Sequence, residues 1–230
     1  MHSAKSNEPT HPDVSEMSKK TEINEILQQK IITSKYRAGQ QLYEKELMQE
    51  YDIGRTPLRE IFQELQRKGL IEIIPKLGTR VVSMDIQELG ESVQIRRELE
   101  GLAAELAARR IHTNQLKRLR EILDESAKAT DNSVESLKKL SDIDVEFHQI
   151  IYEASGNKQL KEIIEGPVNK MIMYWFQIGF SAIDFQSQFE ELEELYVALE
   201  EKAPKKAREI MNRHIEHFIK LVKDNFFELS

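Results

Sequence analysis

Helical periodicity runs through the C-terminal two thirds of this chain of 230 residues. From Asp85 onward, apolar side chains recur at intervals of three and four residues, which places them on one face of an α-helix. Because the chain has only 9 Gly and 6 Pro, few residues can interrupt such helices. The pattern predicts an all-helical bundle over residues 84–230, which could pair with a second copy through an apolar face. Its six helices are expected at residues 86–110, 114–129, 134–154, 158–181, 186–201 and 204–228, with a kink at Pro167.

The composition excludes several classes of protein. With no Cys, the chain is neither a disulfide-stapled secreted scaffold nor a zinc protein that uses thiolate ligands. It contains no run of about 18 apolar residues, so no membrane span is predicted. Its polar N-terminus lacks the apolar stretch of a signal peptide. A cytoplasmic protein with no membrane partner is therefore expected.

Charge is distributed unevenly along the chain, whose formal net charge is −7. Residues 1–18 are polar, offer little that could be buried, and are predicted to form a disordered tail. Residues 19–83 carry 12 Lys or Arg against 9 Asp or Glu, a net charge of +3. The acidity therefore lies in the tail and in residues 84–230, and the net charge of the whole chain does not exclude binding of nucleic acid.

Residues 19–83 have the pattern of a winged helix-turn-helix. Three helices are predicted, at residues 21–33, at residues 44–51, and from Thr56-Pro57 to a stop at Gly69. Two short strands follow at residues 70–74 and 79–82. The expected fold class is therefore mainly α, with an N-terminal winged helix-turn-helix and a C-terminal helical bundle.

The third helix of this module is suited to contact DNA. The polar residues at its N-terminal end are Arg55, Thr56 and Arg59. The helix dipole and two guanidiniums at this end favour a phosphate or a guanine edge. The hairpin supplies a second basic group: Lys76, Gly78 and Arg80. A simpler alternative is that the two helix arginines only form surface ion pairs with Glu60 or Glu64.

Several strings in this module resemble the GntR superfamily of bacterial transcription regulators. They are Tyr36 to Leu42, the string Arg55-Thr56-Pro57-Leu58-Arg59-Glu60, and Gly69-Leu70-Ile71 followed by Gly78-Thr79. The resemblance implies that double-stranded operator DNA is contacted by Lys45, Arg55 and Arg59, with Lys76, Gly78 and Arg80 at the tip of the wing. Relatives commonly have a Ser where this chain has Gly54, so Thr56 or water is expected to cap the recognition helix.

Four polar residues interrupt the apolar faces of the predicted bundle: Arg96, Asp144, His148 and His214. Asp144 and His148 are four residues apart and therefore adjacent on one helix. A carboxylate and imidazoles that meet inside a bundle can hold a divalent cation such as zinc, nickel or manganese. The alternative is that hydrogen bonds alone satisfy these buried polar groups.

Residues 84–230 resemble the effector domain of the FadR-like branch of this superfamily, an all-helical domain of the FCD type. The matching strings are Arg96-Arg97-Glu98-Leu99-Glu100, Asp144-x-x-x-His148, Ser155-Gly156-Asn157 and the segment around His214. In many members an Asp, a His four residues later and two further histidines bind a metal, and a small carboxylate completes the site. Asp144, His148 and His214 match three of these positions, but Leu192 occupies the fourth. Other members use the cavity without metal for another ligand, including acyl-coenzyme A.

The resemblance also implies a set of effector-binding residues: Arg96, Asp144, His148, His214 and Tyr174. Tyr174, Trp175 and Phe176 could line the pocket or fill the core. The chain is therefore expected to be a homodimeric repressor and not an enzyme. The affinity of this repressor for a pseudo-palindromic operator would change when a small carboxylate or acyl metabolite binds. Two alternatives remain open: a metal-dependent hydrolase that uses Asp144, His148 and His214, and a helical interaction adapter with a filled core.

Overall fold

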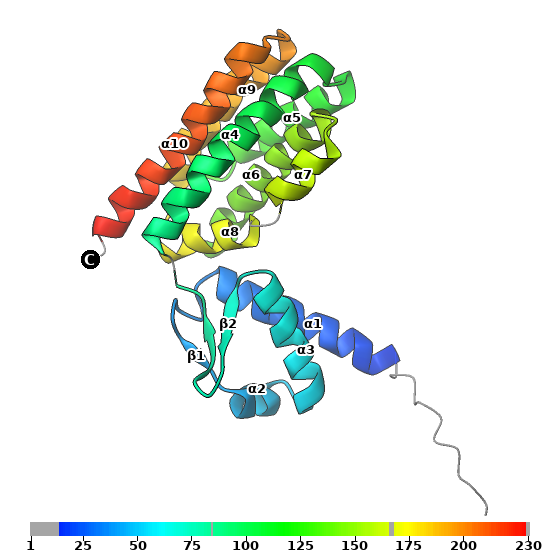
Figure 1. Ribbon diagram of the computed structural model, residues 1–230, viewed down its shortest axis with the longest axis vertical. Coiled ribbons are helices and arrows are strands. Elements are labelled where there is room, and N and C mark those ends of the chain that lie inside the picture. Colours follow the sequence, from blue (N-terminus) through cyan, green and yellow to red (C-terminus); the bar gives the residue numbers. More distant parts are fainter. Residues whose placement is uncertain (1–13, 84, 166–167, 229–230) are drawn as a thin grey trace, which may run out of the picture.

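The computed structural model describes residues 14–228, apart from residues 84, 166 and 167. The chain folds into two parts, a winged domain and a helical bundle, which lie one above the other in Figure 1. Within these residues, no helix has the length and apolar character that a membrane span requires.

The N-terminal part is a winged helix-turn-helix, as predicted. Its elements are α1 (Val14–Ile32), β1 (Gln41–Leu42), α2 (Glu44–Glu50), α3 (Arg55–Arg67), β2 (Ile71–Ile74) and β3 (Gly78–Val81). The strands form an antiparallel sheet in the order β1-β3-β2, in which Arg80 pairs with Gln41 on one side and with Glu72 on the other. Strand β1 was not predicted, because two residues are too few to show an alternating pattern. Helix α1 begins at Val14, so the prediction of disorder is wrong for residues 14–18, while residues 1–13 lie outside the described part.

Helix α3 is held in place by one apolar face. Its inward residues are Leu58, Ile61, Phe62 and Leu65, each at most 1% exposed. Full burial of a side chain of this size contributes about 1.5–3 kcal/mol, and here it fixes α3 against α1 and β2. The helix begins at Arg55 with Gly54 as its N-cap, and no side chain caps it. The prediction that Thr56 caps this helix is therefore wrong, because Thr56 is the second helical residue and is exposed.

The C-terminal part is an all-helical bundle. Its helices are α4 (Ile86–Arg110), α5 (Thr113–Ser126), α6 (Val134–Ala154), α7 (Lys158–Glu165), α8 (Val168–Gln177), α9 (Ala182–Glu200) and α10 (Pro204–Glu228). The fourth predicted helix, over residues 158–181, is in fact two helices, α7 and α8. The expected kink at Pro167 lies outside the described residues. The start of α9 is set by Ser181 and Asp184, which form a reciprocal capping box.

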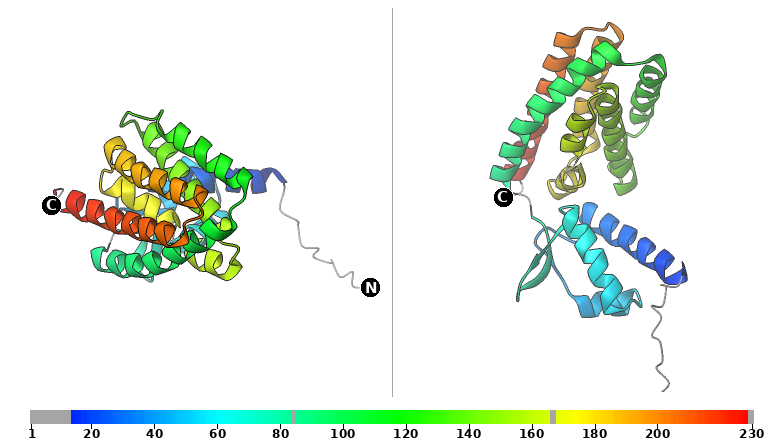
Figure 2. Two further views of the ribbon diagram at one scale, coloured as in Figure 1. Left: turned by 90° about the horizontal axis from the view of Figure 1, so that it is seen from above. Right: turned by 45° about the vertical axis from the view of Figure 1, so that its right-hand side comes forward.

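The long helices α4 and α10 lie side by side along the bundle, and α10 also packs against α9 (Figures 1 and 2). Gly101 permits the close approach of α4 to α10, because a Cβ atom at this position would lie 2.1 Å from Asn212 Oδ1. Helix α6 packs against α4, α5, α7 and α9 and is therefore surrounded by other helices. Polar residues on the inner face of α6 must find their partners within the bundle.

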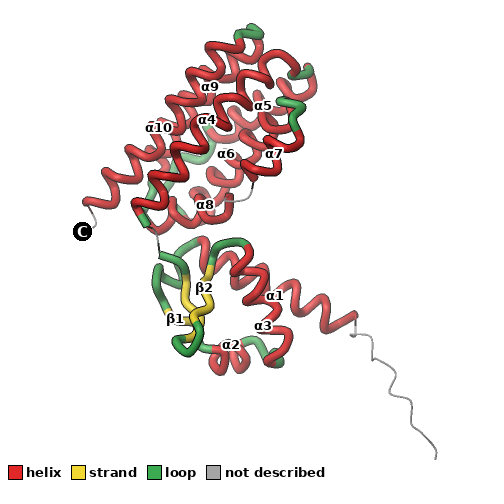
Figure 3. The backbone as a smooth tube through the Cα atoms, in the orientation of Figure 1, coloured by secondary structure: helices red, strands yellow, loops and turns green. Residues whose placement is uncertain are grey.

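Helix α8 lies at the end of the bundle that faces the winged domain (Figure 3). It packs against α1, and Gln177 Nε2 donates a hydrogen bond to the carbonyl oxygen of Val82 at 3.0 Å. Helix α8 therefore contacts both the first helix of the winged domain and the segment that leaves that domain after β3.

Candidate functional sites: the DNA-binding surface and the histidine cavity

The residues predicted to contact DNA lie exposed on α2, α3 and the hairpin of β2 and β3: Lys45, Arg55, Thr56, Arg59, Lys76, Gly78 and Arg80. Helix α2 lies at the end of the winged domain away from the bundle (Figure 1). In the hairpin turn, Lys76 and Gly78 have left-handed backbones, with φ of 67° and 100°. On the hairpin, Arg80 Nε donates a hydrogen bond to Glu72 Oε1 at 2.5 Å. A helix and a basic hairpin on one surface are the parts with which a winged helix-turn-helix contacts DNA.

One carboxylate pairs with both arginines of α3. Arg59 Nε donates a hydrogen bond to Glu44 Oε1 at 2.9 Å, and Arg55 Nε lies 3.7 Å from Glu44 Oε2. The partners considered in the sequence analysis pair elsewhere, Glu60 with Lys20 and Glu64 with Lys68. The alternative that the two arginines form surface ion pairs is therefore realised, but with a partner from the preceding helix instead of Glu60 or Glu64.

A small cavity lies inside the bundle, where α4, α6, α8, α9 and α10 meet. Its volume is about 10 Å³, which is room for about one water molecule. It is lined by Arg96, Asp144, His148, Trp175, Gln188, His214, Ile215 and Phe218. The structure thus brings together, from three helices, the four polar residues that the sequence pattern singled out.

Three of these residues form a potential metal-binding cluster. Asp144, His148 and His214 each offer one ligand atom, and these atoms lie within 4.8 Å of one another. The Nε2 atoms of the two histidines are 3.2 Å apart, and His148 Nε2 is 3.9 Å from Asp144 Oδ2. Ligand atoms that each lie about 2 Å from a zinc ion are separated by roughly 3–4 Å, so this spacing fits a small divalent cation.

Carboxylates behind both histidines favour the tautomer that a metal needs. Glu100 Oε2 lies 2.9 Å from His148 Nδ1, and Glu191 Oε2 lies 3.4 Å from His214 Nδ1. A carboxylate beside Nδ1 favours a proton on that nitrogen, which leaves the Nε2 lone pair directed at the cavity. Two lone pairs 3.2 Å apart repel each other, and a proton or a metal cation between them removes the repulsion.

Arg96 and Glu100 form a buried ion pair next to the cluster. Arg96 Nε donates a hydrogen bond to Glu100 Oε1 at 2.6 Å, and the two side chains are 11% and 0% exposed. Burial would raise the pKa of Glu100, but the Arg96 guanidinium and His148 outweigh burial and lower this pKa to about 2. Burial would likewise lower the pKa of His148, but Asp144 and Glu100 outweigh it and raise this pKa. The electrostatic field at His148 therefore favours a bound proton or cation.

Gln188 is a cavity residue that the sequence analysis missed. It is 4% exposed and lines the cavity, and its Nε2 has no hydrogen-bond partner among the described residues. Gln188 precedes Leu192 by four residues on α9, so the two side chains share one face of the helix. Leu192 is fully buried and offers no ligand atom at the position where the resemblance expects a histidine. Glu100, which was also not predicted as a site residue, follows Arg96 by the same four residues. A polar residue one helical turn from a predicted site position was therefore the signal that could have found both Gln188 and Glu100.

Of the three neighbouring aromatic residues on α8, Trp175 lines the histidine cavity, and Tyr174 does not. Tyr174 is 3% exposed and packs in the core. The ring of Trp175 packs edge-on against Phe185 and Phe218, with centroids 5.1 Å and 6.1 Å apart. Helix α8 therefore reaches the cavity through its tryptophan.

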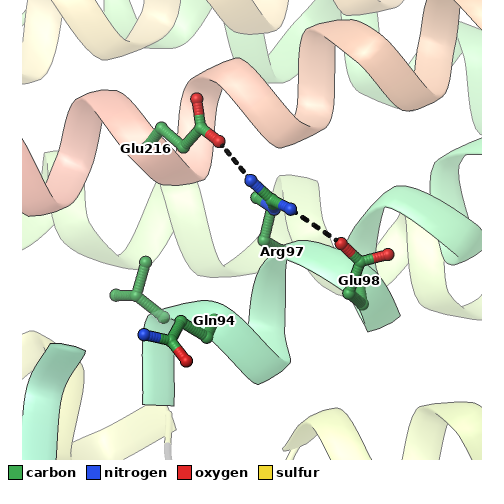
Figure 4. A pocket seen from close by; sticks show the side chains of 5 residues that line it. Gln94, Arg97, Glu98 and Glu216 are labelled. Carbon is green, nitrogen blue, oxygen red and sulfur yellow. Dashed lines mark hydrogen bonds and ion pairs between the residues drawn. The ribbon is translucent and has the colours of Figure 1, made fainter. Parts of the chain in front are cut away.

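A larger hollow on the outside of the bundle, between α4 and α10, has a volume of about 390 Å³ (Figure 4). Arg97 crosses it and pairs with Glu216 at 2.7 Å and with Glu98 at 3.0 Å. Gln94 and Val93 complete its lining. The charged groups of this hollow, Arg97, Glu98 and Glu216, already pair with one another at the surface, so the buried histidine cavity is the better candidate for a ligand site.

Comparison with known protein families agrees with this arrangement. Residues 19–81 match the gntR family of bacterial regulatory proteins, and residues 91–217, more than half of the chain, match the FCD domain. The chain belongs to the GntR family of transcription regulators. Such regulators bind DNA and are not enzymes, so the hydrolase considered above is excluded. The resemblance that the sequence analysis drew from the string around Arg55 is confirmed, as is the mainly α fold.

Relatives of this GntR regulator come from several bacteria. The HTH-type transcriptional regulator YdhC of Bacillus subtilis is 25% identical over 193 residues, which is 84% of each chain. The HTH-type transcriptional repressor NanR of Enterobacter is 30% identical over 156 residues, 59% of this chain and 58% of NanR. Among solved structures, Escherichia coli McbR/YncC has a TM-score of 0.73 at 21% identity and covers 90% of this chain and 98% of its own. A GntR regulator from Rhodococcus sp. RHA1 has the same TM-score and the same coverage at 19% identity. At these identities the two structures show a shared fold.

Proposed function

We propose that this GntR regulator is a ligand-responsive repressor that binds a pseudo-palindromic operator as a homodimer. Residues 19–83 would bind the DNA, and residues 84–230 would bind the ligand and dimerise. The observation that carries the proposal is the buried cluster of Asp144, His148 and His214, which lies in a different domain from the exposed basic surface. The names of relatives such as NanR and RspR, both transcriptional repressors, support repression.

The cluster is suited to one divalent cation, zinc, nickel or manganese. Asp144, His148 and His214 would hold it, with Leu192 leaving one protein ligand fewer than in many relatives. Three protein ligands leave an open coordination position, as in zinc sites that bind water or a further ligand. The carboxylates of Glu100 and Glu191 would orient the two imidazoles, as second-layer partners of metal-bound histidines do.

The charges around the cavity favour a small carboxylate as the effector. Arg96 is paired with Glu100, and Glu191 is paired with Arg213, so a divalent cation next to Asp144 would leave one positive charge that these groups do not neutralise. A monoanion restores neutrality in a site that water does not screen. The Gln188 amide could donate its unpartnered N–H to an oxygen of that anion. An acyl metabolite with a carboxylate head is compatible with the same chemistry.

Helix α8 provides a route from the cavity to the DNA-binding domain. The cavity holds about 10 Å³, so anything larger than water has to displace part of its wall, and Trp175 of α8 belongs to that wall. The same helix packs against α1 and donates the hydrogen bond from Gln177 to Val82. A ligand that favours one position of α8 would therefore favour one placement of the winged domains, which is how binding at one site changes affinity at another.

Binding as a dimer is supported by the modest charge of the winged domain. With a net charge near +3, residues 19–83 lack a broad basic field, so two copies acting together would supply affinity that one copy lacks. Dimers of helix-turn-helix proteins place their recognition helices on half-sites about one helical turn of DNA apart. The operator is therefore expected to be a pseudo-palindrome.

Selection from a pool of random duplexes tests the DNA-binding half of the proposal. The wild-type protein should enrich a pseudo-palindromic sequence, and Arg59→Ala should lose specific binding without losing dimerisation. A thermal-shift screen of zinc, nickel and manganese, each with and without small carboxylates, tests the effector half. No enriched sequence, or no stabilisation by any metal or carboxylate, would contradict the corresponding half.

A further inference from the structure

We propose that Glu44 is a specificity-determining residue of the DNA-binding surface: it restrains Arg55 and Arg59 so that they bind poorly to phosphates in general and well to one base sequence. The inference rests on the proposed role of these two arginines in contacting DNA. Glu44 itself belongs to α2 and would act through the arginines that it holds.

The geometry shows one carboxylate shared between two guanidiniums. Both oxygens of Glu44 face Arg59: Nε donates to Oε1 at 2.9 Å, and Nη2 donates to Oε2 at 3.4 Å. Arg55 Nε lies 3.7 Å from Oε2. The Glu44 side chain is 32% exposed, whereas those of Arg55 and Arg59 are 68% and 61% exposed. The carboxylate is therefore partly covered, and the two guanidiniums remain open to an incoming duplex.

Other acidic residues near this surface do not share this role. Glu46 lies in the same first turn of α2 and is exposed, but no ion pair joins it to a described residue. Glu50, at the other end of α2, pairs with Lys30. Glu44 is therefore the carboxylate of α2 that contacts both arginines of α3. Glu46, a neighbour of equal charge, lacks this contact and can serve as a control.

This arrangement affects specific and non-specific DNA in opposite ways. With Glu44 included, the three charged groups carry +1 instead of +2, which weakens binding to any sequence through phosphates. A guanidinium has five N–H groups, and Glu44 engages two of those of Arg59, which leaves three for a base edge. Holding the side chain in place beforehand reduces the rotamer entropy lost when a guanine is bound. Glu44 would therefore raise the ratio of specific to non-specific affinity.

The test compares the wild type with Glu44→Gln and Glu46→Gln, two variants with the same change of charge on the same turn. Fluorescence anisotropy would measure dissociation constants for a random-sequence duplex and for the duplex that the wild type selects, over a series of salt concentrations. Glu44→Gln should bind the random duplex about two- to fivefold more tightly than Glu46→Gln does. For Glu44→Gln, the logarithm of the binding constant should fall more steeply with the logarithm of the salt concentration than for Glu46→Gln, by about one unit of slope. The reason is that a guanidinium released from Glu44 can bind one more phosphate.

The decisive quantity is the ratio of the two affinities. Glu44→Gln should lower the ratio of specific to random-duplex affinity, and Glu46→Gln should leave this ratio near the wild-type value. Equal ratios in the two variants, or a higher ratio in Glu44→Gln, would overturn the role of Glu44. If the wild type selects no sequence, or if Arg59→Ala selects the same one as the wild type, the proposed function of the arginines fails instead, and the two failures are thus distinguishable.

Discussion

Replacing Glu100 by Gln would remove the negative charge from a buried position that contacts both Arg96 and His148. The carboxylate is fully buried, 2.6 Å from Arg96 Nε and 2.9 Å from His148 Nδ1. Its pKa is lowered from 4.5 to about 2, even though burial acts in the opposite direction. A displacement of this size corresponds to about 3 kcal/mol in favour of the charged form in the folded protein. Loss of one partner from other buried ion pairs has a similar cost, roughly 3–5 kcal/mol.

Equilibrium unfolding in urea, at one protein concentration, would measure this cost. Glu100→Gln should lower the free energy of unfolding by about 3 kcal/mol at neutral pH. Glu98→Gln is the matched control, because Glu98 lies on the same helix and pairs with Arg97 and Arg208 but is 54% exposed. Its loss should have a much smaller effect, as for other exposed pairs. If both variants lost the same free energy of unfolding, the buried ion pair would contribute no more to stability than an exposed one.

The pH dependence supplies a second readout of the same pair. A carboxyl group whose pKa is lowered on folding stabilises the protein above its unfolded pKa, and this stabilisation is lost as the pH falls through the folded pKa. The difference between the wild type and Glu100→Gln should therefore be full above about pH 4.5 and shrink toward pH 2. A difference that stayed constant over this range would assign the effect to packing.

Three further predictions concern other parts of the molecule. His214→Ala should abolish tight binding of zinc or nickel in isothermal titration calorimetry, and unchanged binding would exclude His214 as a ligand. Leu192→His should raise the zinc affinity about tenfold or more, because it adds an imidazole one turn beyond Gln188 on α9. An unchanged zinc affinity in calorimetry would show that this face of α9 does not reach the metal. Asp85→Ala removes the N-cap of α4, whose carboxylate accepts hydrogen bonds from the N–H groups of Gln87 and Glu88. It should lower the free energy of unfolding in urea by about 1 kcal/mol, and an unchanged free energy would show that the cap is dispensable.

Much of the fold was predictable because the signals for it are local. The spacing of Leu58, Ile61, Phe62 and Leu65 defines the buried face of α3, and the same kind of spacing locates most helices of the bundle. Local signals were insufficient where an element is very short, as for β1, or where apolar periodicity continues through a break, as between α7 and α8. The start of α1 was misjudged because residues 14–18 offer only two apolar side chains, those of Val14 and Met17, and a low apolar content does not exclude a helix.

The candidate sites were only partly predictable, because helical phase does not show which helices meet. It placed Asp144 and His148 together on α6, but their proximity to His214 and Gln188 depends on the packing of α6, α9 and α10. The pairing of both α3 arginines with Glu44 is likewise a contact between two helices. Gln188 was missed because the expected ligand position, Leu192, is apolar, and a polar residue one turn away was not considered as its replacement.

If the contents of the histidine cavity change the affinity for DNA, the affinity for the selected duplex must depend on what the cavity holds. Fluorescence anisotropy would give the dissociation constant of the selected duplex for the wild type and for His214→Ala. Each protein would be measured metal-free, with zinc, nickel or manganese, and with each metal plus acetate, lactate or citrate. We expect at least one metal–carboxylate combination to shift the dissociation constant of the wild type by about fivefold or more and to leave that of His214→Ala unchanged. Equal shifts in both proteins, or no shift in the wild type under any of these conditions, would contradict it.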